Sequence, residues 1–155
     1  MANYNSSLYA SQAAALTDYS QAPNLKDAGG NVHILHVQVD LPSTLNAVDE
    51  LRLGYLPPTA KVIPALCRVQ PSATPTNAIS LNVGTAAAAD AFAKAIPISA
   101  TSLAGVAFDS TNNALTQAVN PVKVTGNTPV IAKATANVTV GTGKALTFFI
   151  AYTLG

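Results

Sequence analysis

The spacing of short apolar segments from Asn31 to the end of the chain is the feature that most constrains the fold. Within each segment apolar and polar residues alternate, and turn-forming residues separate the segments at intervals of roughly ten residues. Alternation with a period of two is typical of β-strands that bury one face, because successive side chains of a strand point to opposite sides. The sequence therefore predicts an all-β fold of about eight strands.

The first half of this region contains the clearest expected strands. Residues 32–41 predict a strand whose odd-numbered side chains from Leu35 onward face the core. Residues 49–56 predict a second strand, and residues 60–70 a third, again with an apolar odd-numbered face. Pro64 lies within the third segment. It has no N–H to donate to a neighbouring strand, so it indicates an edge strand or a bulge.

The second half continues the pattern with one interruption. Residues 78–85 predict a strand, and the alanine-rich residues 86–96 after it predict a single short helix. Residues 130–154 predict a hairpin around the turn Gly141-Thr142-Gly143. Many short strands with at most one helix are typical of an antiparallel sandwich or barrel, and about eight strands in two packed sheets favour a jelly roll. The remaining expected strands cover residues 105–108, 118–126, 129–140 and 145–154.

The first thirty residues differ from the rest of the chain. They are rich in Asn, Ser, Ala, Gln and Tyr and lack a sustained apolar face. We expect residues 1–30 to form an extended arm that becomes ordered only against a partner or against the body, and residues 31–155 to form the β-sandwich domain. A frayed terminus is the alternative. Tyr4, Tyr9 and Tyr19 are the aromatic anchors of the arm, and tyrosine is a residue type enriched at interfaces.

The composition indicates a surface made for contact. Hydrophobic residues make up 49% of the chain and charged residues only 10%, whereas globular proteins average roughly 25% charged residues. Charge normally keeps free monomers apart, so a neutral surface suits a protein that packs against its own copies or a large partner. An ordinary soluble domain with a bland surface remains the alternative.

Several partners are not expected. The net charge is +1 and no run of Lys or Arg occurs, so a nucleic-acid footprint is not predicted. No apolar stretch approaches the roughly 20 residues that span a bilayer as a helix. The N-terminal residues lack the basic and apolar regions of a Sec-type signal peptide, so we expect synthesis in a cytosol and no membrane association.

Residue patterns that carry chemistry are also sparse. His33 and His36 point to opposite faces of a strand and cannot jointly hold a metal. Asp49 and Glu50 are adjacent carboxylates that diverge, so they do not form a glycosidase pair. Cys67, in an apolar strand pattern, predicts a buried inert thiol. Nucleophile elbows, phosphate loops and dinucleotide fingerprints do not occur. We therefore expect no catalytic residues, no cofactor, no metal and no enzyme activity.

Three segments carry a resemblance to a known group of proteins. They are LRLGYLPPTAKVIPALCRV (residues 51–69), AISLNVGTAAAADAFAKAIPIS (residues 78–99) and the closing ALTFFIAYTL (residues 145–154). In order and character these segments resemble the jelly-roll capsid decoration or cement proteins of tailed bacteriophages. The likeness covers about four-fifths of the chain, and its motifs are structural. The arm lies outside it.

The resemblance implies a virion structural protein that binds the outside of the capsid and stabilises it by bridging capsid subunits. The implied partners are the major capsid protein and further copies of the chain in a dimer or trimer, and the implied place of synthesis is the cytoplasm of a bacterial host. A head-fibre, tail or baseplate component is the first alternative. A carbohydrate-binding jelly roll is the second, although the chain lacks Trp.

If the resemblance holds, two regions are the expected contacts with the capsid or with other copies. One is the arm with its three tyrosines, and the other is the proline-containing corner after the strand over residues 49–56. The expected contact residues are Tyr4, Tyr9, Tyr19, Tyr55, Pro57 and Pro58.

Overall fold

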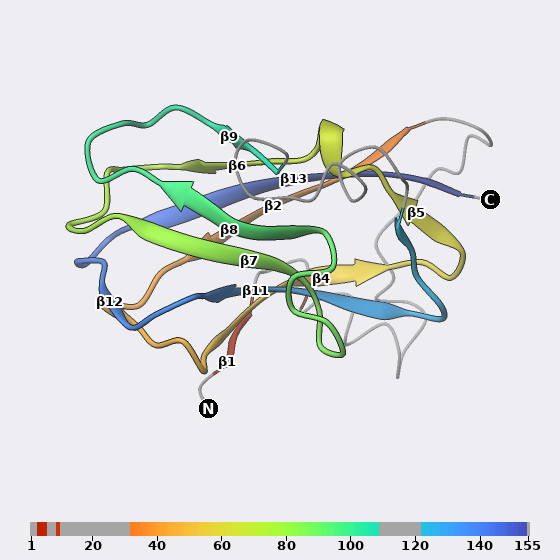
Figure 1. The fold of residues 1–155 in the computed structure, drawn as a ribbon, viewed down its shortest axis with the longest axis horizontal. Coiled ribbons are helices and arrows are strands. Elements are labelled where there is room, and N and C mark those ends of the chain that lie inside the picture. The colour runs from red at the N-terminus through yellow and green to blue at the C-terminus, as the bar shows by residue number, and fades with distance from the viewer. Residues whose placement is uncertain (1–2, 6–8, 10–31, 109–121, 155) are drawn as a thin grey trace.

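The chain folds as a sandwich of two β-sheets (Figure 1). The computed structural model describes residues 3–5, 9, 32–108 and 122–154. Sheet A contains β1 (Asn3–Asn5), β4 (Glu50–Leu56), β11 (Thr128–Ala134), β7 (Ile79–Thr85) and β8 (Ala93–Ile98), in that order. β1 runs parallel to β4, and the other neighbours in sheet A are antiparallel. The all-β sandwich expected from the sequence is confirmed.

Sheet B is built around the long closing strand β13 (Ala145–Leu154), with β2 (His33–Asp40) along one edge. The other edge of β13 pairs first with β6 (Arg68–Pro71) and then with β5 (Ala60–Val62). Two short strands extend the sheet: β10 (Val122–Lys123) pairs with β5, and β9 (Val106–Ala107) pairs with β6. A separate pair, β3 (Thr44–Leu45) with β12 (Val138–Thr139), joins two loops.

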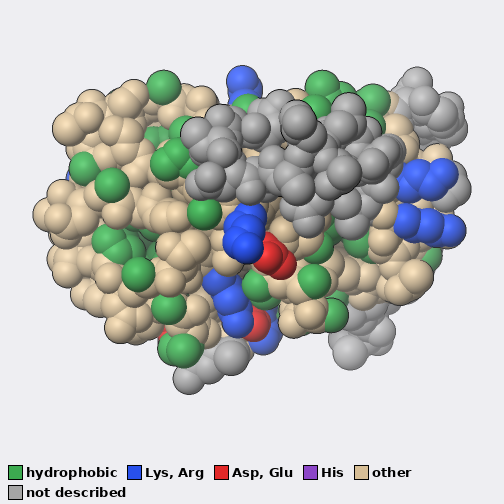
Figure 2. All heavy atoms as spheres, in the orientation of Figure 1, with side chains coloured by type: hydrophobic (Ala, Val, Ile, Leu, Met, Phe, Trp, Pro, Cys, Tyr) green, Lys and Arg blue, Asp and Glu red, His purple; other side chains and the backbone are tan. Residues whose placement is uncertain are grey.

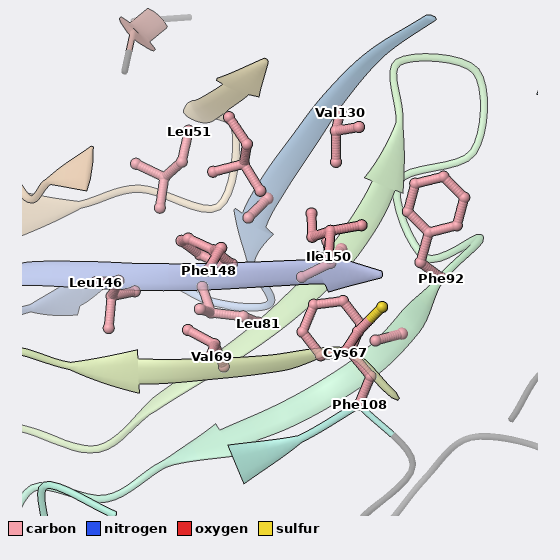
Figure 3. Packing of buried hydrophobic residues seen from close by; sticks show 14 of the residues in the cluster. Leu51, Cys67, Val69, Leu81, Phe92, Phe108, Val130, Leu146, Phe148 and Ile150 are labelled. Atoms are coloured by element: carbon pink, nitrogen blue, oxygen red, sulfur yellow. The ribbon is translucent and has the colours of Figure 1, made fainter. Parts of the chain in front are cut away.

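The hydrophobic core lies between the two sheets (Figure 3). Sheet B contributes the expected odd-numbered side chains of β2 and the even-numbered side chains of β13 from Leu146 to Tyr152, all of them buried. β2 follows the predicted alternation from Leu35 onward, and β13 follows it for its large side chains up to Tyr152, although Ala145 and Ala151 are also buried and Leu154 is only partly buried. The two strands pair with each other in regular register. The side chains of Phe92, Phe108 and Phe148 are fully buried between the sheets.

A β-bulge in β4 sets which of its side chains reach solvent. Val130 of β11 pairs with Gly54, but the next residue, Ile131, pairs with Arg52, so β4 carries one extra residue at Leu53. The bulge reverses the alternation. Leu51, Leu53 and Leu56 are therefore all buried, and Arg52 and Tyr55 both lie on the outer face of sheet A.

The single strand predicted over residues 60–70 is wrong. β5 and β6 are separated by a short 3-10 helix, Pro64–Leu66. The five residues 63–67 between the two strands lie opposite only two residues of β13, so the segment has three residues more than a continuous strand would. The three extra residues change the alternation, and Val62 rather than Ile63 is buried. Pro64 begins the 3-10 helix, so the bulge that it indicated is present, on a larger scale than a single inserted residue.

The buried thiol of Cys67 bridges this interruption. The N–H of Ala151 in β13 has no strand carbonyl opposite it, and it donates to Cys67 Sγ at 3.2 Å. The thiol in turn donates to the carbonyl oxygen of Ile63 at 3.2 Å. Burial raises the pKa of Cys67 to about 12, so the thiol stays protonated and unreactive near neutral pH. Cys67 therefore replaces a missing backbone partner.

We expect Cys67→Ala to lower the free energy of unfolding by about 1–3 kcal/mol, because it leaves the Ala151 N–H unpaired in the core. Denaturant unfolding measures the loss, and hydrogen exchange should show a less protected Ala151 amide. Cys67→Ser keeps a donor and an acceptor and is the matched control. Unchanged protection of Ala151 in Cys67→Ala would contradict this role.

The helix predicted over residues 86–96 is also wrong. Residues 86–92 form turns that fold back onto the end of β7, and β8 begins at Ala93. The Phe92 N–H donates to the Val83 carbonyl at 2.9 Å, and the buried Phe92 side chain anchors the returning chain. An alanine-rich segment has high helix propensity, but burial of Phe92 and pairing of β8 with β7 outweigh that preference.

The predicted hairpin over residues 130–154 is wrong in its pairing. β11 pairs with β4 and β7 in sheet A, whereas β13 lies in sheet B. The segment between them, including β12 and the turn at Gly141, crosses from one sheet to the other. No helix in the described part of the chain is long and apolar enough to cross a membrane.

Candidate contact surfaces

The sequence-predicted contact residues fall into two groups in the structure. On sheet A, Tyr9 and Tyr55 lie against each other on the outer face, and Tyr4 of β1 pairs with Leu51 of β4 and packs against the core. Pro57 and Pro58 come after β4 at the end of the sandwich, Pro57 half-buried and Pro58 exposed. Tyr19 lies outside the described residues.

Tyr9 is held by stacking and hydrogen bonds to β4. Its ring stacks on Tyr55 with centroids 5.0 Å apart and planes at 19°. The Tyr55 hydroxyl donates to the Tyr9 hydroxyl at 3.1 Å, and Arg52 Nη1 donates to the same oxygen at 3.2 Å. The pKa of Tyr55 is raised above its usual value, most of all by the hydrogen bond to Tyr9 and to a smaller extent by burial. The described arm residues thus lie against the body, through β1 and Tyr9.

The charged residues beside this tyrosine pair form ion pairs within sheet A. Glu50 Oε2 lies 3.6 Å from Arg52 Nε, and Glu50 Oε1 lies 3.3 Å from Lys133 Nζ on β11. Because one carboxylate faces two cations, it offsets only one of them, and this cluster keeps a net charge of +1. Such partly exposed pairs at a protein surface contribute about 1 kcal/mol each to stability.

The proline corner contains a strained residue. The Ala60 N–H donates to the Pro57 carbonyl at 3.2 Å, which closes a four-residue turn with Pro58 and Thr59 at its centre. Thr59 has a φ of 68°, a left-handed conformation that costs a β-branched residue about 1–2 kcal/mol. Strain of this kind concentrates at functional positions, so the corner stays a candidate contact.

The outer face of sheet B presents a second candidate surface, which sequence reasoning missed. We define it by His36, Lys61, Arg68, Lys123 and Phe149, which share this face through their pairing register. The residue in the sequence that could have indicated this surface is Phe149. It is a large aromatic residue on the polar face of a strand whose even-numbered residues form the core.

The structure places the two histidines on opposite faces of β2, as expected. His33 stacks on Tyr152 at the inner face, with centroids 5.4 Å apart, and His36 stacks on Phe149 at the outer face. Within the described ranges, no group of three or more His, Cys, Asp or Glu side chains is positioned to hold a metal ion.

The comparisons with known proteins define the class of fold. No protein-family model and no curated protein matches the chain. Among solved structures, a chain of the cyanophage Pam1 capsid asymmetric unit has a TM-score of 0.60 at 24% identity, over 86% of this chain and 92% of that chain. A chain of the capsid of Ralstonia phage GP4 has a TM-score of 0.59 at 19% identity, over 99% of both chains. This protein therefore has a β-sandwich fold that also occurs in these two phage capsids.

Proposed function

We propose that this chain is a structural protein of a phage virion that binds the outside of the capsid and stabilises it by bridging capsid subunits. The observation that carries the proposal is the fold shared with the GP4 capsid chain over 99% of both chains. The Pam1 likeness, over 92% of the other chain, supports it in the same way.

The proposed mechanism is mechanical. Contact with two adjacent capsid subunits adds binding free energy that outward pressure on the shell must overcome. The partners are the major capsid protein and other copies of this chain in a dimer or trimer, and assembly occurs after synthesis in the bacterial host cytoplasm. Many copies on one shell gain from multivalency, because each bound contact raises the effective concentration of the next.

We assign residues 1–30 to an arm and residues 31–155 to the sandwich domain. Pairing of β1 with β4 and stacking of Tyr9 on Tyr55 fix two points of this arm on sheet A, so the assignment takes the arm as ordered against the body. In the proposed complex the arm enlarges the contact area on the shell, with Tyr19 among its contacts and the corner at Pro57 and Pro58 beside it.

The proposal involves no catalysis. Its support is chemical: burial keeps the Cys67 thiol protonated, and the two histidines lie on opposite faces of β2. Nucleophilic or metal-assisted chemistry needs such groups to converge.

Co-sedimentation with heads of the parent phage that lack this protein tests the proposal. We expect saturable binding at a fixed ratio to the major capsid protein, together with a higher disruption temperature of the heads. Deletion of residues 1–30 should reduce occupancy. Absence of binding by the full chain would contradict a decoration role. In that case, binding to isolated tails or fibres, or a hit in a glycan screen, would support one of the two alternatives.

A further inference from the structure

A row of stacked side chains crosses the outer face of sheet B. Phe149 in the central strand β13 pairs with His36 on one side and Arg68 on the other. The His36 and Phe149 rings stack with centroids 4.6 Å apart and planes at 11°, and Arg68 Cζ lies 4.5 Å from the Phe149 centroid. The aromatic ring therefore favours one orientation of the Arg68 guanidinium, so its exposed N–H donors lose less conformational freedom when they bind a partner.

A second row on the same face brings two lysines together. Lys61 of β5 pairs with Thr153 of β13 and directly opposes Lys123 of β10. Like charges in opposite positions of an antiparallel pair are destabilising. Thr153 lies four residues beyond Phe149, so this row is about 13 Å from Arg68. Basic side chains accordingly gather at the end of the molecule where β5 and the C-terminus lie (Figures 1 and 2).

The basic residues on the two sheets differ in their ion pairing. Glu50 faces both Arg52 and Lys133 on sheet A. On sheet B, none of Lys61, Arg68 and Lys123 forms an ion pair with a residue in the described ranges. The one described carboxylate on this face is Asp40, which lies opposite Ala145, four residues along β13 from Phe149. That offset is again about 13 Å, beyond the range of an ion pair.

Exposed apolar side chains flank the cations. Ile34 in β2 is 60% exposed, and Leu66, in the 3-10 helix between Lys61 and Arg68, is 58% exposed. A face that combines Arg and an aromatic ring with exposed aliphatic groups has the composition of a protein-binding surface.

We propose that the outer face of sheet B docks against an acidic patch of a capsid subunit. Arg68 forms the central carboxylate contact, Phe149 holds it in place, and the Lys61–Lys123 pair meets a second acidic group. This inference rests on the proposed function and names the surface that performs it. Acidic groups of the partner supply the countercharge that Asp40, about 13 Å along β13 from Phe149, is too far away to provide, and Ile34 and Leu66 contribute apolar contact around them.

A nucleic acid is the less favoured occupant of this face. Its backbone carries closely spaced charges, and proteins that bind it usually present Lys and Arg in a dense stripe. Here three cations lie in two rows separated by about 13 Å, with apolar residues beside them. Such spacing fits discrete carboxylates on a folded protein better than a line of phosphates.

The test compares two double variants that remove equal charge. Lys61→Gln/Arg68→Gln removes two cations from sheet B, and Lys94→Gln/Lys144→Gln removes two from elsewhere. Each variant and the wild type are titrated onto heads of the parent phage lacking this protein, at several salt concentrations. We expect the sheet B variant to bind at least about tenfold more weakly at 0.15 M salt, with a shallower salt dependence. The control should stay within about twofold of the wild type.

The outcomes separate this inference from the proposed function. Saturable wild-type binding with equal affinity in the sheet B variant would overturn the inference and leave the capsid role intact. Wild-type binding that does not weaken with salt would overturn it without reference to any variant. Failure of the wild type to bind heads would remove the proposed function and the inference together. Binding of the wild type to a DNA duplex but not to heads would assign the face to nucleic acid and also overturn it.

Discussion

Replacement of Gly84 by alanine is expected to lower the free energy of unfolding by at least about 3 kcal/mol, at the upper end of overpacking costs. A Cβ at this position would lie 2.2 Å from the Ala88 carbonyl oxygen and 2.7 Å from the Ala91 nitrogen. Both atoms belong to the backbone of the turn that folds back over β7, so no side-chain rotation relieves the clash. The turn has to move, and with it the anchored Phe92.

The loss in Gly84→Ala should appear in denaturant unfolding as a lower midpoint. Gly105→Ala is the matched control, because a Cβ there meets its nearest neighbours at 3.8 Å, an ordinary contact distance. We expect that control to stay within about 0.5 kcal/mol of the wild type. A Gly84→Ala protein as stable as Gly105→Ala would mean that residues 85–91 do not pack over β7 as described.

The parts of the fold that sequence predicts well are those with unbroken periodicity. The large side chains of β2 and β13 alternate between the core and the outer face, and the two strands pair with each other in regular register, so residue parity assigns the large buried side chains correctly. The parts that failed contain extra residues. One additional residue in β4 and three between β5 and β6 shift the parity of the residues after them, and local sequence does not encode such insertions clearly.

The remaining errors have different causes. The helix expected over residues 86–96 rests on alanine propensity, which tertiary packing overrides. The hairpin expected over residues 130–154 rests on nearness in sequence, whereas β11 and β13 find their partners in different sheets. Pairing between distant segments depends on the whole fold, so a single sequence gives little information about it.

The candidate contact surfaces, like the fold, can be predicted from the sequence only in part. Tyrosines in the arm and the proline corner stand out by residue type. The sequence does not show that Tyr9 stacks on Tyr55, because 46 residues separate them. Nor does it show the row of His36, Phe149 and Arg68, since its members come from three strands that meet only in sheet B.

Phe148→Ala is expected to lower the free energy of unfolding by about 3–5 kcal/mol. The Phe148 side chain is fully buried, and Phe148 pairs with Val37 of β2 on one side and with Val69 of β6 on the other. Figure 3 shows Phe148 and Val69 within the core. Its removal opens a cavity in the middle of the sandwich. Domains of this size have a total stability of about 5–15 kcal/mol, so the variant should lose a large part of its stability and unfold at a much lower denaturant concentration.

Phe149→Ala provides the contrast, because it removes the same side chain one residue further along the same strand. Phe149 is half-buried on the outer face, where it contacts His36 and Arg68, so its loss should cost only about 0.5–1.5 kcal/mol of stability. It should nevertheless weaken binding to capsids, because Arg68 loses the ring that orients it. Equal loss of stability in the two variants would contradict the assignment of Phe148 to the core and Phe149 to the surface. Opposite behaviour of two adjacent phenylalanines would show that strand parity in β13 separates the residues that fold the domain from those that make contact.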